Sequence, residues 1–389
     1  MPELQPKRIA EFIKPFRVQP GRTVRLQRDF DPGYTAGFEK KESGATEILA
    51  QGVELLAEYQ ARLAAQDTHG VLVVLQAMDA AGKDGTIKHV MSGVNPQGVN
   101  VHSFKVPSSE ELDHDYLWRY AKSLPARGHI GIFNRSYYEE VLVVRVHPGI
   151  LDGQKLPPGT KKGDVWGRRF REINDWERYL ADQGFRIVKL FLNVSQEEQR
   201  RRFLARIDLA EKNWKFSAND AKERALWDDY QKAFEDVLSH TSTVWAPWYV
   251  IPADNKWFAR VAAAGVIANA LIEIDPEYPV VSEEARAALQ EAKLELEAEA
   301  PKGAAPDPVE AELAAKAEKA AKAEKAAAKA AQAEKAAEVE AAAEVEAAAE
   351  VEAEVPATGE AATATEPEKG TKAKGKGRRK KAKGKGASA

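Results

Sequence analysis

Residues 70–90 read GVLVVLQAMDAAGKDGTIKHV. The apolar run at the start of this stretch is typical of a strand that is buried on both faces of a parallel sheet. Small residues, a Gly-Lys pair and a helical pattern follow it directly. Backbone N–H groups approach phosphate oxygens closely only where side chains are small. The stretch therefore predicts a strand, a phosphate-binding loop and a helix, in that order.

The predicted loop covers residues 79–86 and departs from the usual G-x-x-x-x-G-K-[ST] pattern. Ala77 replaces the first glycine, and Asp84 replaces the Ser or Thr whose hydroxyl would bind magnesium. Asp79 is a hard oxygen donor that could bind the metal instead, while Lys83 and the helix N-terminus attract the anion. An ordinary strand–turn–helix with a solvated lysine is the alternative. The predicted phosphate-binding residues of the loop are Ala80, Ala81, Gly82, Lys83, Asp84, Gly85 and Thr86.

Apolar segments alternate with helical patterns along the rest of the chain, which favours a three-layer α/β domain with a parallel sheet. The first 40 residues are harder to interpret, because IKPFRV and TVRLQRDF could be short strands or an extended arm. Beyond them we predict strands at 70–78, 99–106, 129–133, 186–194 and 248–254. We predict helices at 45–66, 84–94, 111–124, 165–183, 196–210, 221–240 and 256–274.

Polar residues follow the third predicted strand. Asn134 takes the position at which P-loop enzymes place an acidic residue that helps to hold the metal. Arg135 comes next, and its planar guanidinium suits a phosphate clamp. Because strand ends line the ligand crevice of open α/β sheets, these residues are candidates for the site. A polar loop that caps a helix is the alternative.

Basic residues gather in two later segments, Arg168–Arg171 and Arg202–Lys215. Arg202 and Arg206 are four residues apart, so they share one face of a predicted helix. Acidic residues surround them, as on an ordinary solvated surface helix. Beside a phosphate loop the same charges would form an anion channel, or a lid that closes over phosphates.

The composition excludes several classes of site. The 389 residues contain no cysteine, which rules out disulfides, cysteine-ligated zinc, iron–sulfur clusters and a cysteine nucleophile. The formal net charge of -3 indicates no partner by itself. We find no apolar run of the ~20 residues that a membrane helix needs. The first residues lack the apolar core of a secretion signal, so we expect a cytoplasmic protein without a membrane partner.

The chain changes character near residue 295. All 8 tryptophans lie between Trp118 and Trp257, and no aromatic residue follows Pro301. We therefore predict a folded domain over 1–295 and a low-complexity tail over 296–389, helical or disordered. About ten positive charges lie in the last segment of the tail. The tail is either a solubilising extension or an arm that binds polyphosphate or nucleic acid through counterion release.

Several segments together resemble the polyphosphate kinase 2 family over about residues 10–275. The resemblance implies a single thymidylate-kinase-like P-loop core with a helical lid at about 198–240, and a homo-oligomer. It also implies magnesium-dependent phosphoryl transfer between inorganic polyphosphate and nucleotides, namely AMP, ADP and ATP or their guanine equivalents. The segments that carry it are QAMDAAGKDGTIKHV, GVNPQGV, FKVPSSEELDHDYLWR, GHIGIFNRSYYEEVLVVRVH, RFREINDWERYL and RIDLAEKNWKFS.

The resemblance also implies roles for individual residues. Lys83 would contact the transferred phosphoryl group, Asp79 the metal and Arg135 a phosphate. Asn134 replaces the Asp of many members, and with Glu139 and Gly-Lys-Asp-Gly it resembles the subgroup that phosphorylates both nucleoside mono- and diphosphates. The further implied phosphate- or nucleotide-binding residues are Lys105, Arg168, Arg169, Arg202, Arg206 and Lys215.

Two other functions are compatible with the sequence. A nucleotide kinase with a nucleoside triphosphate donor would use the same phosphate loop. A nucleic-acid- or polyanion-binding protein would act through the basic end of the tail, with a vestigial core. The basic lid and the family resemblance argue against the first alternative, and the presence of Lys83 and Asp79 argues against the second.

Overall fold

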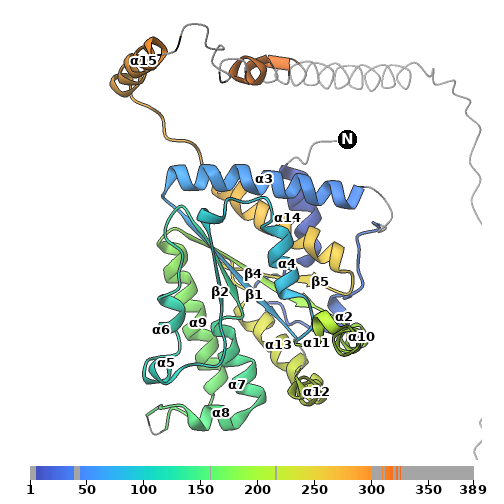
Figure 1. Cartoon of the computed structure of the whole chain (residues 1–389). Coiled ribbons are helices and arrows are strands. Elements are labelled where there is room, and N and C mark those ends of the chain that lie inside the picture. Colours follow the sequence, from blue (N-terminus) through green and yellow to red (C-terminus); the bar gives the residue numbers. More distant parts are fainter. Residues whose placement is uncertain are drawn as a thin grey trace, which may run out of the picture. The chain divides into compact units, whose positions relative to one another are not determined.

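The computed structural model describes residues 6–38, 44–157, 159–214 and 217–299, together with short stretches between 301 and 325. Five parallel strands form one sheet in the order β2-β3-β1-β4-β5 (Figure 1). All five lie where the sequence predicts strands, so the predicted α/β fold is confirmed. The strands are β1 Gly70–Ala77, β2 Val99–Ser103, β3 Ile130–Asn134, β4 Phe185–Asn193 and β5 Trp248–Pro252.

Strand β1 lies at the centre of the sheet, and all eight of its residues are buried. Helices cover both faces of the sheet at β1, so its apolar side chains are buried on both sides, as the sequence predicts. Leu75 pairs with Asn134 of β3, and Ala77 pairs with Leu192 of β4. The loops that follow β1, β3 and β4 therefore leave the sheet at the same edge, where ligands bind in open α/β sheets.

Helix α14 (Lys256–Ile274) packs on one face of the sheet, with α1, α3 and α4 around it (Figure 1). By length and composition this helix could cross a membrane, although the sequence analysis found no apolar run of that length. In the structure, 67% of its most apolar window is buried inside the fold. The same composition suits a helix that is covered on nearly every side by protein. The neighbouring helices are α1 Pro6–Ile13, α3 Gly44–Gln66 and α4 Lys83–Val90.

Helices α9 (Val165–Asp182) and α13 (Trp227–Thr241) cover the other face. The predicted helix 111–124 is interrupted. It forms α5 (Ser109–Asp113) and α6 (Trp118–Ala121), because His114 is extended and the Asp115 side chain accepts a hydrogen bond from the backbone N–H of Leu117 at 2.9 Å. Shorter elements complete this side: η3 Tyr137–Val141, α7 Val143–Val146 and α8 Pro148–Gly153, whereas η2 Pro96–Gly98 contacts α3.

The predicted helix 221–240 is also two helices, α12 (Ala218–Ala225) and α13, which separate at Leu226. Seven residues of α13 are buried, so this helix belongs to the core although the predicted lid at 198–240 includes it. The remaining part of that range consists of α10 (Gln196–Asp208), α11 (Ala210–Asn213) and α12. A lid smaller than the predicted one is therefore compatible with the packing.

The N-terminal segment is partly helical, so the expected short strands were wrong at the helical positions, while residues 18–25 and 30–38 form neither helix nor strand. The segment contains α1, a 3-10 turn η1 (Lys14–Phe16) and α2 (Leu26–Asp29), and only Arg17 forms a β-bridge, with Tyr249. Tertiary contacts decide the conformation here. Phe16 is buried, and the backbone N–H of Leu26 donates to Glu235 Oε1 of α13 at 2.8 Å.

A polar cluster lies inside the core between β4, α9 and η3. Lys189 Nζ donates to Glu177 Oε2 at 2.6 Å, and neither side chain is exposed to solvent. Tyr137 and Tyr138 donate their hydroxyls to the other oxygen of Glu177, at 2.7 and 2.8 Å. Lys189 also donates to the carbonyl of Thr241 at 2.6 Å. These bonds compensate for the burial of two opposite charges.

The chain divides into two units, Met1–Glu283 and Glu284–Ala389, rather than near residue 295. The first unit contains the sheet and the helices described above. The helix α15 (Glu283–Ala298) belongs almost entirely to the second unit and has no buried residue. The basic block at the end of the predicted tail lies outside the described residues.

Candidate phosphate-binding site

The loop after β1 turns sharply into α4. Strand β1 ends at Ala77 and α4 begins at Lys83, each one residue before the predicted boundary. Gly82 has a φ of 112° and Ala80 a φ of 62°. The left-handed region suits glycine but strains alanine, and such strain is typical of loops that are shaped for a ligand. The N-terminus of α4 thus opens directly onto the loop, where its free N–H groups favour an anion.

Lys83 is folded back onto the loop. Its Nζ donates to the carbonyl oxygen of Ala77 at 2.9 Å. Burial of the ammonium group, followed by the positive charge of Arg135, lowers the pKa of Lys83 to about 8. The carboxylates of Asp79 and Glu139 act in the opposite direction on this pKa. A phosphate bound beside Lys83 would add negative charge and restore the preference for the protonated form.

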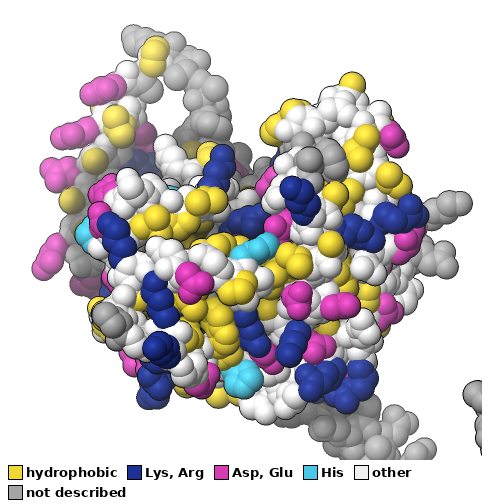
Figure 2. Space-filling view, turned by 90° about the horizontal axis from the view of Figure 1, so that it is seen from below, with side chains coloured by type: hydrophobic (Ala, Val, Ile, Leu, Met, Phe, Trp, Pro, Cys, Tyr) yellow, Lys and Arg dark blue, Asp and Glu magenta, His cyan; other side chains and the backbone are white. Residues whose placement is uncertain are grey.

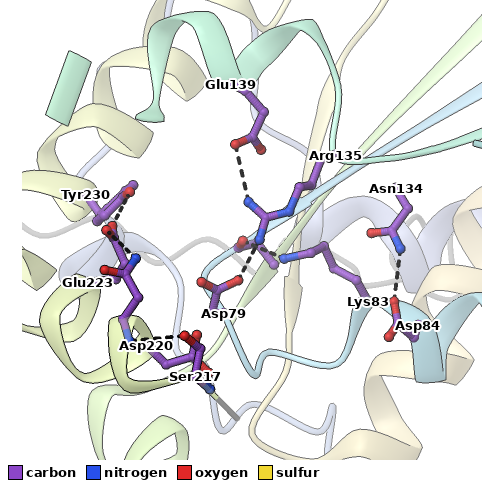
Figure 3. Close-up of polar contacts among 12 residues, drawn as sticks. Asp79, Lys83, Asp84, Asn134, Arg135, Glu139, Ser217, Asp220, Glu223 and Tyr230 are labelled. Carbon is purple, nitrogen blue, oxygen red and sulfur yellow. Dashed lines mark hydrogen bonds and ion pairs between the residues drawn. The ribbon is translucent and has the colours of Figure 1, made fainter. Parts of the chain in front are cut away.

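Arg135 lies between two carboxylates of the site (Figure 3). Its Nη2 donates to Asp79 Oδ1 at 2.8 Å, and its Nη1 donates to Glu139 Oε2 at 3.4 Å. Arg135 itself has a φ of 66°, a left-handed conformation that is strained for a residue with a long side chain. The structure thus brings together three of the predicted residues, Asp79, Arg135 and Glu139, at the carboxyl edge of β1 and β3.

Asn134 connects the ends of β2 and β3 to α4. Its Nδ2 donates to Asp84 Oδ1 at 2.9 Å (Figure 3). The same nitrogen lies 3.4 Å from Ser103 Oγ. Two of the three positions at which the sequence departs from the commoner patterns, Asn134 and Asp84, are therefore in direct contact. Among the other predicted loop residues, Ala80, Ala81 and Thr86 are buried and Gly82 and Gly85 are partly exposed.

Helix α12 contributes acidic residues that the sequence analysis did not select. Asp220, Glu223 and Tyr230 line a small cavity together with Asp79 and Arg135. Burial and the nearby charge of Asp79 raise the pKa of Asp220. The predicted helix 221–240 covers most of α12, and the sequence signal that could have located its start is the capping box of Ser217 and Asp220. That signal gives the start of the helix, but not the surface against which it packs.

Glu223 of α12 contacts two neighbouring elements. Tyr230 of α13 donates its hydroxyl to Glu223 Oε2 at 2.7 Å, and His147 Nε2 lies 3.0 Å from the same oxygen. Arg206 of α10 pairs with Asp220 at 3.5 Å. The predicted basic face of α10 is therefore partly neutralised by α12. Lys215 lies outside the described residues.

The structure gives Arg202 a place other than the predicted phosphate channel. Its side chain is buried, and it donates to the carbonyls of Ala80, Ala81, Ala253 and Asp254 and to the carboxylate of Glu198. A guanidinium has five N–H donors. All of them are engaged by these contacts, so a phosphate could bind Arg202 only by displacing a protein acceptor.

The other predicted basic residues lie farther along the same edge. Arg169 is buried and donates to Glu140 Oε2 at 3.0 Å and to Gln154 Oε1 at 2.6 Å. Arg168 donates to the carbonyl of Thr160. Lys105 is exposed in the segment after β2, and its carbonyl accepts a hydrogen bond from Arg119. None of these contacts joins the three side chains to the phosphate loop.

A larger cavity of about 410 Å³ opens near Arg168 and Arg169. Residues that follow β2 and β3 line it, so it lies at the same edge of the sheet as the loop. Glu140 lines this cavity, whereas the preceding residue, Glu139, contacts Arg135 at the phosphate loop. In Figure 2, basic and acidic side chains are interspersed across the face seen from below, so that face is mixed in charge.

A magnesium ion requires hard oxygen donors, which carboxylate side chains supply. Within the described residues, no group of three or more His, Asp or Glu side chains is arranged to hold a metal ion. Magnesium commonly uses only one or two carboxylates together with substrate phosphates and water. Asp79, with 34% of its side chain exposed and one oxygen bonded to Arg135, fits that requirement. Its role as a metal ligand stays a prediction.

Comparison with known proteins agrees with this geometry. The family model described as polyphosphate kinase 2 matches residues 39–278. An ADP-polyphosphate phosphotransferase of Rhodopseudomonas palustris is 50% identical over 287 residues, which cover 73% of this chain and 98% of that protein. An AMP/ADP-polyphosphate phosphotransferase of Meiothermus ruber is 47% identical over 267 residues, which cover 69% of this chain and 96% of that protein.

A solved structure gives the same result for the fold. The crystal structure of polyphosphate kinase 2 from Arthrobacter aurescens TC1 is similar with a TM-score of 0.63 at 39% sequence identity. The match covers 72% of this chain and 95% of that chain. Together with the strand order and the loop after β1, this similarity confirms the predicted P-loop kinase-like core.

Proposed function

Since this chain belongs to the polyphosphate kinase 2 family, we propose that it transfers a phosphoryl group between inorganic polyphosphate and nucleoside mono- and diphosphates. The observation that carries the proposal is the convergence of Lys83, Arg135 and the N-terminus of α4 at one edge of the sheet. These groups supply positive charge and N–H donors where a phosphoanhydride can bind. One of the two relatives is named for ADP, and the other for both AMP and ADP, which supports mono- and diphosphates as acceptors.

The chemistry requires little from the protein beyond position and charge. Polyphosphate already contains phosphoanhydride bonds, so transfer to a nucleotide oxygen needs no covalent enzyme intermediate. Lys83 donates to an oxygen of the transferred group, and Arg135 leaves its carboxylate partners to clamp a neighbouring phosphate. Asp79 would hold magnesium, which neutralises phosphate oxygens when it is bound. Arg206 of α10, which pairs with Asp220 of α12, approaches the polyanion when this pair opens.

The cavity of about 410 Å³ is proposed as the site of the acceptor nucleoside. Its lining includes Tyr116 and His114, and His114 stacks on Trp118 with ring centroids 3.9 Å apart. Aromatic walls with a few charged groups suit a base and a ribose. Tyr116→Ala is expected to raise the KM for the nucleotide by about tenfold, because stacking on a base is worth ~1–3 kcal/mol. Tyr116→Phe, which keeps the ring, is the matched control.

The deciding experiment starts from a nucleoside monophosphate. Purified protein is incubated with magnesium and AMP, with and without long-chain polyphosphate, and the products are separated by chromatography. We expect the diphosphate to appear first and the triphosphate after it, only when polyphosphate is present. Product formed with a nucleoside triphosphate donor alone would favour an ordinary nucleotide kinase. Diphosphate without triphosphate would restrict the acceptors to monophosphates.

The proposal also covers the oligomeric state of the protein, its location in the cell and the role of its tail. We propose a homo-oligomer in the cytoplasm, as the resemblance and the composition imply. The basic end of the tail is proposed to attract polyphosphate, because about ten positive charges lie in its last segment. Size-exclusion chromatography coupled to light scattering tests the assembly.

A further inference from the structure

Two side chains of helix α10 donate hydrogen bonds to backbone carbonyl groups of the phosphate loop. Gln199 Nε2 donates to the carbonyl of Asp79 at 3.0 Å. Arg202 Nη1 donates to the carbonyls of the next two residues, Ala80 at 3.1 Å and Ala81 at 2.6 Å. Both side chains are buried, with 1% of Gln199 and 7% of Arg202 exposed. Three consecutive peptide groups of the loop are thus fixed by two side chains more than 100 residues away.

Fixing a carbonyl also fixes the N–H group that follows it. A trans peptide is planar, and its C=O and N–H point in opposite directions. The carbonyls of Asp79 and Ala81 belong to the same peptide planes as the N–H groups of Ala80 and Gly82. Those two N–H groups therefore point away from α10. The third one, of Ala81, donates within the loop to the carbonyl of Met78 at 3.3 Å.

Arg202 extends this support to a third segment. Its Nη2 donates to the carbonyls of Ala253 at 2.5 Å and Asp254 at 3.0 Å, which follow β5. Its Nε donates to Glu198 Oε1 at 2.8 Å, which keeps the guanidinium in a single orientation. The loop, the end of β5 and α10 are consequently held in one arrangement by one side chain.

Gln199 connects the loop to the acidic helix of the site. Its Oε1 accepts a hydrogen bond from Arg224 Nη1 of α12 at 2.8 Å, and the same nitrogen donates to the carbonyl of Gln196 at 2.8 Å. Arg224 thereby selects the orientation of the Gln199 amide in which Nε2 faces the loop. If Arg224 moved away, the amide could rotate and present an oxygen to the carbonyl of Asp79.

We propose that Gln199 and Arg202 are positioning residues that hold the loop in its phosphate-binding conformation, and that Arg224 makes this support depend on the place of α12. The inference rests on the proposed function, phosphoryl transfer at this loop. It follows from these contacts that departure of α12 loosens the peptide of Asp79 and return of α12 orders it. The loop is then fully shaped only when α12 covers the site.

The test compares variants of the full-length protein. Gln199→Met removes the donor to Asp79, and Arg224→Met removes the group that orients Gln199. We expect each to lower kcat about 3- to 10-fold, the rate equivalent of one net hydrogen bond, with little change in the KM for the nucleotide. Lys222→Met is the matched control, because it removes an exposed positive charge from α12 with no contact to Gln199. It should leave kcat within twofold.

The double variant Gln199→Met/Arg224→Met separates coupling from independent damage. Because Arg224 acts through Gln199, the double variant should lose no more activity than Gln199→Met alone. Multiplied losses, or a Gln199→Met variant within twofold of the original protein, would overturn the inference. Arg202→Lys should lose more activity than either, and its thermal midpoint identifies any loss through unfolding. If the unmodified protein did not use polyphosphate, the proposed function would fail instead.

Discussion

Arg135 donates from Nη2 to Oδ1 of Asp79 across 2.8 Å. One partner is predicted to clamp phosphate and the other to bind the metal, and without substrate each balances the charge of the other. Glu139 adds a second carboxylate to the same guanidinium at 3.4 Å. Substrate binding must therefore exchange contacts between protein groups for contacts to phosphate and metal. This exchange makes affinity depend on both partners together, because the loss of either leaves an unbalanced charge.

The pH dependence of activity should show the titration of the Lys83 amino group. Its pKa in the free protein lies at about 8, so the ammonium is protonated below that pH and neutral above it. We expect kcat/KM, which reports groups of the free enzyme, to fall as the pH rises through about 8. Bound phosphate favours the charged form, so the corresponding fall in kcat should occur at higher pH.

Two variants isolate this effect. Lys83→Ala should lower turnover at least ~100-fold, a typical electrostatic contribution, with an unchanged circular dichroism spectrum. Lys83→Arg keeps its charge at all accessible pH values, so the fall in kcat/KM near pH 8 should vanish although the rate is reduced. Near-normal turnover of Lys83→Ala would exclude the phosphate-loop assignment.

The metal dependence should report Asp79. Asp79→Asn retains an acceptor for Arg135 but removes the negative charge that a hard cation prefers. We expect this variant to need more magnesium for half-maximal activity and to have a lower maximal rate. Glu11→Gln, at an exposed position on α1, is a control for the loss of one carboxylate. If the magnesium requirement of Asp79→Asn is unaltered, the metal is bound elsewhere.

Because Asn134 and Asp84 are in contact, the effect of a substitution at Asn134 on kcat/KM should depend on the residue at position 84. Asn134→Asp would place two carboxylates where a hydrogen bond of 2.9 Å now lies. We expect kcat/KM above neutral pH to fall about tenfold, the equivalent of ~1.4 kcal/mol. Asp84→Gly in the same chain should restore most of the loss, since it removes the second carboxylate. A double variant no better than Asn134→Asp would show that repulsion is not the cause. The ratio of rates with AMP and ADP tests whether the pair also sets acceptor preference.

Much of the fold could be predicted because buried strands have a local signature. The apolar run of β1 and the Gly-Lys pair after it are consecutive in sequence, so the loop and its lysine were located without tertiary information. Arg135 was found for a similar reason, since it directly follows a strand. The helix at 111–124 was mispredicted because its interruption depends on one side chain, that of Asp115.

The support of the loop could not be predicted in the same way. Arg202 has the sequence context of an exposed helix, with acidic and basic neighbours. Its burial depends on loop carbonyls more than 100 residues earlier in the chain. Gln199 and Arg224 carry no local signal either, because a glutamine next to an arginine is ordinary on helix surfaces. Only packing of α10 beneath the loop distinguishes these residues.

Substitutions in the buried pair of Lys189 and Glu177 should lower the free energy of unfolding rather than the catalytic rate. Lys189→Met leaves a carboxylate without its cation inside the core, which typically costs about 3–5 kcal/mol. Glu177→Gln/Lys189→Met removes both charges and should be clearly more stable than the single variant. Urea unfolding followed by circular dichroism measures both. Equal destabilisation of the single and double variants would mean that the cost comes from lost packing.

The last prediction concerns the chain after the folded unit. Helix α15 has no buried residue, and the division between the units falls at residue 283. Chains that end at residue 300 or at Glu283 should therefore keep the thermal midpoint and the rate at saturating polyphosphate. An unfolded or inactive truncated protein would show that the later segment belongs to the fold.

Removal of the basic block should instead affect the KM for polyphosphate. The block contributes about ten positive charges, which raise the local concentration of a long polyanion. Truncation at residue 300 should raise the KM for long chains at low salt and leave that for short chains nearly unchanged. At high salt the difference should disappear, because screening removes long-range attraction. The acidic repeat before the block opposes the effect, so a second variant that lacks only residues 369–386 should show a larger rise in KM than the complete truncation. An equal KM for all three proteins at low salt would exclude a role of the block in substrate capture.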